Sequence, residues 1–200
     1  IINDETKKKL IAIIDDKKNL SNEALLEPDK KQLNKLLELY NKSLFKDAFF
    51  FGQDLLISYP KSPLILNIMG AVNDKLFNIK TSVQYFKSAY NYDQNNASIL
   101  NNLSGILIKL KKYDEALKYL NKSLSLNSNS AEVYYNIGSC YYMLNKFEDS
   151  IISLKKANSI KPNFSNYQLR LSHALYKAGR YHEAIDAVVL DLTKIKHNFN

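Results

Sequence analysis

The side chains that most often carry out chemistry are few in this sequence and unsuitably spaced. The three histidines are His173, His182 and His197, and no two have the i,i+4 spacing of a helical metal site. No nucleophile motif accompanies them, and the chain has neither a phosphate-binding loop nor a glycine-rich dinucleotide fingerprint. We therefore expect no catalytic residue, no metal site and no cofactor, and we predict that the chain is not an enzyme.

The single cysteine, Cys140, excludes an internal disulfide framework. It lies between Ser139 and Tyr141 in an expected helix, with neither a cation nor a helix N-terminus beside it to lower the pKa of its thiol. We interpret Cys140 as a small buried residue.

Composition and charge fit a helical globular chain. Of its 200 residues 46% are hydrophobic and 24% charged, and 5 Gly and 4 Pro are too few for a turn-rich all-β protein. No stretch approaches the roughly 20 apolar residues of a membrane helix, and the first residues lack a signal-peptide pattern. We expect a cytoplasmic location and no membrane partner, although a removed targeting sequence stays open. The net charge of +8 is thinly spread and favours acidic partners weakly.

A 34-residue repeat organises most of the sequence. Five blocks align without insertion or deletion, and they are residues 29–62, 63–96, 97–130, 131–164 and 165–198. The twentieth residue of a block is small in all five, and the residue four further on is bulky in four. Because spacings of 3 and 4 share one helical face, each block predicts two helices, over its first 14 residues and over its residues 17 to 30.

Local signals agree with this division. Ser62, Asn96 and Ser130 precede expected first helices and are suitable N-caps. Asn145 and Gly179 can adopt the left-handed conformation that ends a first helix. The expected helix boundaries therefore follow from capping chemistry as well as from the repeat.

This pattern resembles the tetratricopeptide repeat, whose period is 34 residues and whose eighth and twentieth columns are small. The block from Ala131 matches best, through Tyr134, Ile137, Gly138, Tyr141, Phe147, Ala157 and Pro162, with Ser150 for the usual Ala. The first block departs most, because Leu36 replaces the small eighth residue and Gly52 the usual aromatic one. The resemblance covers Asp29 to about His197. It implies an all-α, right-handed α-solenoid of about five tandem helix-turn-helix repeats.

Residues 1–28 do not fit the repeat. Leu10, Ile11, Ile13 and Ile14 could form one apolar helix face, and such a helix would cap the exposed flank of a terminal repeat. A lead-in without a capping role is the alternative, and the sequence leaves both open.

The resemblance implies a ligand-binding groove lined by the first helices. In this family the second, fifth, sixth, ninth, twelfth and thirteenth columns face the groove. From these columns we take ten candidate peptide-binding residues: Asn67, Asn101, Asn102, Lys109, Tyr135, Asn136, Tyr142, Arg170, His173 and Lys177. The implied function is a protein- or peptide-binding scaffold for a protein or an extended peptide, with oligomeric state undetermined.

Two interpretations of the recurrent asparagines stay open. Asn has poor helix propensity, yet it recurs at Asn102 and Asn136. In some family members, such as nuclear glycosyltransferases that carry these repeats, Asn in this column forms a ladder along the backbone of a bound peptide. The alternative is that these amides are solvated or bond one another across repeats.

More specific partners receive little support. Asn136 and Arg170 match two of the five positions of the carboxylate clamp found in chaperone-binding family members, so chaperone-tail recognition is not expected. Nucleic acid is not favoured, because few aromatic residues interleave with the lysines of the groove columns.

An alternative function comes from a second resemblance. The run from Leu33 to Ala71 is similar to N-terminal repeat regions of bacterial proteins whose later part is a transferase. Under that alternative, the repeats are an accessory domain of a longer enzyme and position its protein substrate.

Overall fold

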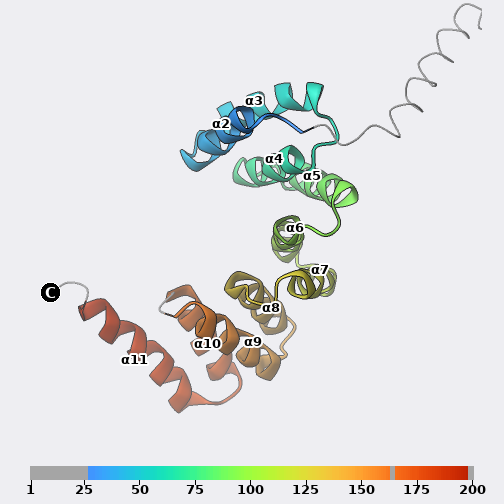
Figure 1. The fold of residues 1–200 in the computed structure, drawn as a ribbon. Coiled ribbons are helices and arrows are strands. Elements are labelled where there is room, and N and C mark those ends of the chain that lie inside the picture. The colour runs from blue at the N-terminus through green and yellow to red at the C-terminus, as the bar shows by residue number, and fades with distance from the viewer. Residues whose placement is uncertain (1–26, 163–164, 198–200) are drawn as a thin grey trace, which may run out of the picture.

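The computed structural model describes residues 27–162 and 165–197, and α-helix is the only regular secondary structure in these residues (Figure 1). The helices are α2 Lys30–Asn41, α3 Phe45–Ser58, α4 Pro63–Lys75, α5 Ile79–Tyr92, α6 Ala97–Lys109, α7 Tyr113–Leu126, α8 Ala131–Met143, α9 Phe147–Ile160, α10 Ser165–Lys177 and α11 Tyr181–His197. The expected all-α solenoid is thereby confirmed. The cap proposed for the N-terminal segment falls on residues 1–26 and lies outside the described residues.

The helices follow the repeat closely. The first helices α4, α6, α8 and α10 begin 34 residues apart, and the second helices α3, α5, α7, α9 and α11 begin at the same interval. None of the helices in the described part of the chain is both long and apolar enough to cross a membrane.

Side chains cap the first helices where the sequence predicts it. Ser62, Asn96 and Ser130 each accept a hydrogen bond from a backbone N–H in the first turn of the helix that follows. Asp29 and Gln32 form a reciprocal capping box at the start of α2. These bonds satisfy N–H groups that have no partner inside the helix, and so they set where each helix begins.

A left-handed residue joins the two helices of every described pair. Asn145 and Gly179 have φ of 58° and 77°, as expected, and Ser43, Phe77 and Lys111 hold the same column at about 60°. The left-handed region costs a side-chain-bearing residue about 1–2 kcal/mol. In each turn the next N–H donates to the carbonyl five residues earlier, which is the hydrogen bond of a Schellman motif and offsets that cost.

Small residues let the two helices of a pair approach closely. A Cβ atom on Gly138 would lie 2.6 Å from Cγ of Leu154, and one on Gly70 would lie 2.6 Å from the ring of Phe86. The Ser150 hydroxyl donates to the carbonyl of Gly138 over 2.7 Å. The eighth and twentieth columns therefore form the closest seam within a pair.

The first pair departs from this pattern at two residues, Leu36 and Gly52. Leu36 is fully buried where the other pairs have a smaller residue. A Cβ atom on Gly52 would overlap Sδ of Met69, which packs in the same core cluster as Leu36. Gly52 thus leaves room for Met69 of the second pair, in the same core cluster that buries Leu36.

The helix pairs follow an arc, with α4, α6 and α8 on its inner side and α5 and α7 on its outer side (Figure 1). The backbones of successive first helices approach one another throughout the described residues, whereas second helices of neighbouring pairs meet only through side chains, as Tyr90 of α5 and Tyr119 of α7 do. Because the inner helices crowd and the outer helices spread apart, the first helices line the concave side.

Candidate functional site

A cavity of about 350 Å³, hereafter the groove cavity, lies on the concave side over α4, α6 and α8. Four of the ten candidate residues line it, and they are Asn101, Asn102, Lys109 and Asn136. A fifth candidate, Asn67, joins them through a hydrogen bond to Asn102. The structure therefore brings half of the predicted set together at one place.

Other groove-facing residues complete the cavity. Tyr40, Asp74, Gly105 and Glu132 also line it, although none was among the ten candidates. They occupy the twelfth, ninth and second columns, which the resemblance assigns to the groove. The column was therefore the signal that points to these residues.

The asparagines of the groove bond one another across repeats. The Asn102 amide donates to Oδ1 of Asn67 over 3.0 Å, and the Asn136 amide donates to Oδ1 of Asn101 over 2.9 Å. In both pairs the sixth column of one first helix bonds to the fifth column of the helix before it. An Asn amide has two donor hydrogens and an acceptor oxygen, so each pair retains hydrogen-bonding capacity on its half-exposed side.

The candidate residue Lys109 forms an ion pair with an acidic neighbour. Its Nζ lies 2.6 Å and 2.5 Å from the two carboxylate oxygens of Asp74, on the preceding first helix. The Lys109 side chain is 55% exposed and that of Asp74 18% exposed. The positive charge of Lys109 is therefore neutralised here, because the twelfth column of the adjacent helix carries the opposite charge.

Tyr40 lies beside the same carboxylate. Burial raises the pKa of the Tyr40 phenol, and the charge of Asp74 raises it further. Since both effects disfavour the phenolate, Tyr40 stays neutral and offers the groove a hydroxyl group.

Gly105 opens the middle of the groove cavity. A Cβ atom built on this residue meets no atom within 4 Å, unlike those built on Gly70 and Gly138. Gly in a helix interior costs roughly 0.5–1 kcal/mol relative to Ala, and neither packing nor a positive φ requires it at this position. The absence of a side chain at Gly105 therefore leaves space in the groove rather than in the core.

The remaining aromatic candidates have packing partners. Tyr135 stacks on Tyr167 with ring centroids 5.0 Å apart, so it belongs to the interface between α8 and α10. The Tyr142 ring has the Arg170 guanidinium 5.5 Å from its centroid, a cation–π geometry. In the part of the chain that the structure describes, Arg170 has no carboxylate partner.

His173 and Lys177 lie apart from the groove cavity. Both are exposed on α10, and His173 lines a separate pocket between α10 and α11. The ten candidates thus divide into the group at the groove cavity and a second group on α8 and α10.

Two further observations concern metal ligands and the single thiol. They contain no group of three potential metal ligands. Cys140 is buried, and burial raises the pKa of its thiol to about 12, with a smaller contribution from the charge of Asp114. A thiol that stays protonated at neutral pH is not a nucleophile.

The comparisons with known proteins agree with the fold. A family profile described as Tetratricopeptide repeat matches residues 95–163. A search of curated proteins gives no match.

Among solved structures, this chain is similar to MamA 41-end from Desulfovibrio magneticus RS-1, with a TM-score of 0.76, 18% identity, and coverage of 87% of this chain and 98% of that one. Pseudomonas aeruginosa pilF gives 0.75 and 21%, covering 82% and 74% of the two chains. TTC0263, a thermophilic TPR protein in Thermus thermophilus, gives 0.69 and 18%, covering 82% and 90%. The chain therefore carries a tetratricopeptide-repeat region, within an all-α solenoid that shares the fold of these proteins.

Proposed function

We propose that this chain is a protein-binding scaffold that holds an extended peptide segment of a partner in the groove cavity. The observation that supports this most directly is the association of two Asn–Asn pairs with an unobstructed Gly105 on the concave side. Gly and Asn in a helix interior make the helix less stable than better helix formers would. We attribute their presence in these first helices to ligand binding.

The groove cavity suits a peptide backbone better than a strongly charged ligand. Lys109 is paired with Asp74, and Glu132 offsets Lys75, so these four charged lining residues balance. The amides, by contrast, offer both donors and acceptors. A backbone segment presents alternating N–H and C=O groups whatever its side chains, so recognition here is mainly through hydrogen bonds.

The second group of candidates, on α8 and α10, predicts how the partner segment is oriented along the groove. Arg170, held over Tyr142, and the exposed Lys177 make the α10 side of the groove positive. An acidic side chain of the partner would gain most at this end, through a charge-assisted hydrogen bond to the guanidinium. We therefore place the acidic part of the partner segment toward α10 and its uncharged part over α6.

The test compares three immobilised baits that differ only in two asparagines. The groove variant is Asn102→Ala with Asn136→Ala. The matched control is Asn91→Ala with Asn121→Ala, because both residues are exposed on the outer helices α5 and α7. Proteins captured from a lysate of the source organism are identified by mass spectrometry.

We expect the wild-type and control baits to capture the same protein and the groove variant to lose it. Each lost hydrogen bond is worth roughly 0.5–1.5 kcal/mol net, so the double variant should weaken binding by about fivefold to about 150-fold. Equal capture by all three baits would place the contact outside the groove.

A further inference from the structure

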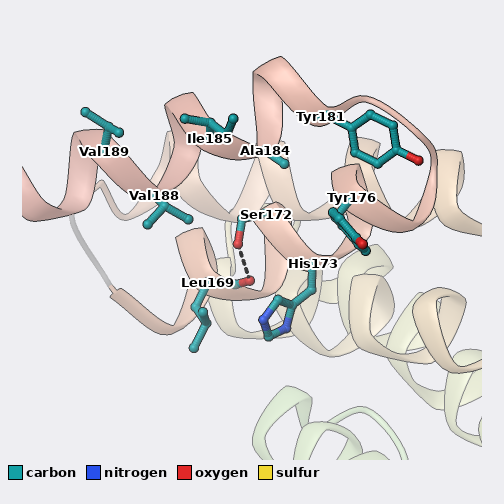
Figure 2. A pocket seen from close by; sticks show the side chains of 9 residues that line it. All are labelled: Leu169, Ser172, His173, Tyr176, Tyr181, Ala184, Ile185, Val188 and Val189. Carbon is teal, nitrogen blue, oxygen red and sulfur yellow. Dashed lines mark hydrogen bonds between the residues drawn. The ribbon is translucent and has the colours of Figure 1, made fainter.

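A cavity of about 250 Å³ lies where α9, α10 and α11 meet, and it shares no lining residue with the groove cavity. It is also separate from the apolar pocket that His173 borders on α10 and α11 (Figure 2), because those two cavities have no lining residue in common either. The polar side chains of its wall are Lys155 and Asn158 of α9, Gln168 of α10, and Glu183 and Asp186 of α11. We call this space the amide cavity, after Asn158 and Gln168.

Two side-chain oxygens at the amide cavity lack a hydrogen-bond donor. Gln168 is only 4% exposed, and among the described residues neither its Oε1 nor the buried Oδ1 of Asn158 has a partner. Burying an amide without a hydrogen bond costs free energy, and native proteins seldom leave such groups unpaired. Because the terminal torsion of an amide side chain is soft, a small rotation turns either oxygen into the cavity that both residues line.

The repeat does not require amides at these two positions. Asn158 holds the twenty-eighth column of its block, and Gln168 holds the fourth column of the next. At the first interface between pairs the same two columns carry Leu56 and Leu66, which pack in one core cluster. The next two interfaces have Leu or Tyr at both columns, namely Tyr90 with Leu100 and Leu124 with Tyr134. Both columns thus become polar together where the fourth pair meets the fifth, at the wall of a cavity.

The charged residues of the amide cavity leave one carboxylate free. Oε2 of Glu183 accepts from Nζ of Lys155 over 3.3 Å, and Arg180 donates to both carboxylate oxygens of Glu183 over 2.7 Å and 2.8 Å. Asp186 is exposed and forms no ion pair with any described residue. The groups of the cavity that remain available are therefore three acceptors, the two amide oxygens and the carboxylate of Asp186.

Three acceptors and a negative charge define the chemistry of the ligand. A primary ammonium group has three N–H donors and no acceptor, so it matches the available groups in number and in charge. The rest of the wall includes Leu171 and Leu175, which are 7% and 1% exposed, and such a surface suits the methylene chain that carries an ammonium group. A carboxylate or a phosphate would instead place its own acceptors against acceptors, beside the like charge of Asp186.

We propose that the amide cavity binds an alkylammonium group, which is either the side chain of a lysine on another protein or one end of a free diamine. The ammonium group donates to Oδ1 of Asn158, to Oε1 of Gln168 and to the carboxylate of Asp186. Its alkyl chain lies against Leu171 and Leu175. The site is independent of the groove cavity and of the function proposed for it.

The probe is n-butylammonium chloride, titrated at constant ionic strength into the isotope-labelled intact chain. Nuclear magnetic resonance follows the backbone amide signals of Leu171 and Ala187, which line the cavity, and we expect their shifts to change and saturate. The control probe, n-butyltrimethylammonium chloride, has the same charge and chain but no N–H donor, so it should leave these signals unchanged. Cadaverine and Nα-acetyl-lysine methylamide are then compared, and the tighter binder of the two shows whether a free diamine or a lysine side chain is the better ligand.

The decisive variant is Asn158→Leu with Gln168→Leu, which places the leucines of the first interface at the fourth. We expect n-butylammonium to bind at least about tenfold more weakly, because two hydrogen bonds to a charged group are lost. We also expect the Tm of this variant to rise, because it buries no unpaired amide oxygen. The matched control is Gln84→Leu with Asn121→Leu, the same exchange at exposed residues of α5 and α7, and it should bind the probe as the wild type does.

Two further variants test the charge and the independence of the site. Asp186→Asn keeps an acceptor but removes the charge, and because Asp186 is exposed it should weaken binding by only about twofold to fivefold. The chain with Asn102→Ala and Asn136→Ala should bind the probe normally, which separates the amide cavity from the proposed function.

Four results would overturn the proposal. The probe could produce no saturable shift, the trimethylammonium control could bind equally well, or Asn158→Leu with Gln168→Leu could bind the probe as tightly as the wild type. A lower Tm for that double variant would also overturn it, because the two amides would then hold hydrogen bonds that stabilise the interface between α9 and α10.

Discussion

The two ends of the described solenoid each have a flank that no described helix covers, and the two flanks differ in polarity. Every internal first helix buries its third, seventh and tenth residues against the preceding pair, but α2 has no described helix on that side and carries Lys31, Lys35 and Glu38 there. At the other end the last pair keeps the apolar residues of an internal surface, including Ile185 at 59% exposure. A polar flank can face water without a partner, whereas an apolar flank gains free energy when covered.

The comparison has a simple consequence for stability. In a repeat protein each repeat is stabilised mainly by the interface with its neighbour. The same column should therefore tolerate substitution at an end and resist it inside. Each of the following variants contrasts an internal position with an end position or a groove position that resembles it.

The largest effect on stability should come from substitutions in the third column of the repeat. Ile65 is fully buried on α4, and Ile65→Lys would place an unpaired ammonium group in the core. We expect a loss of about 3 kcal/mol or more in unfolding free energy, measured as a lower urea midpoint by circular dichroism. The mirror variant Lys31→Ile, on the exposed flank of α2, should change stability by no more than about 0.5 kcal/mol. Equal effects of the two would mean that the flank of α2 is covered.

The next effect concerns the seam within a pair. Gly138→Leu forces side-chain atoms into the space of Leu154, where even a Cβ atom would lie 2.6 Å from Cγ. Overpacking of this kind typically costs about 1–3 kcal/mol. The control is Gly105→Leu, because a Cβ atom at Gly105 meets nothing within 4 Å. Thermal melts should show a lower Tm for Gly138→Leu alone, and an unchanged Tm would show that the closest seam lies elsewhere.

Much of the fold follows from the sequence, because its causes are local. Caps such as Ser62 and Asn96 act within one turn of helix, and the 34-residue period repeats the same seam. The left-handed Phe77 was missed, since the sequence points to Asn or Gly for that conformation and the turn's backbone bonds impose it on other residues.

The partners inside the groove were harder to predict. Asn102 bonds to Asn67, and Lys109 bonds to Asp74, in each case between residues 35 apart. These bonds join a column of one helix to the preceding column of the previous helix, so they depend on the offset between helices. No single block contains that offset. The exposure of Ile185 is likewise a property of what packs beside it and not of its own column.

A smaller effect, in the stabilising direction, is expected from substitution of Gly105, which lies in the groove and not in the core. Gly105→Ala replaces a helix-interior Gly without a new contact, so we expect a gain of roughly 0.5–1 kcal/mol in unfolding free energy. The added methyl group lies in the groove cavity, and capture of the partner should weaken in the bait assay. A variant that is more stable yet binds less would show that Gly105 serves the ligand. Unchanged capture would place the partner segment away from α6.

The smallest effect should come from the ion pair that links α4 to α6. Lys109 and Asp74 lie 2.5 Å apart, but the Lys109 side chain is 55% exposed and water screens the pair. We expect a double-mutant cycle with Lys109→Met and Asp74→Asn to give a coupling of about 0.2–1 kcal/mol at low salt, falling as salt is added. The pair Lys42–Glu38 at the end of α2 is the comparison, because its atoms are 2.6 Å apart and both side chains are at least 60% exposed. Its coupling should be the smaller of the two, since the carboxylate of Asp74 is shielded by neighbouring helices and that of Glu38 is not. Equal couplings would show that the inner side of the arc is as well solvated as its N-terminal end, and that the groove cavity gives its polar groups no electrostatic advantage.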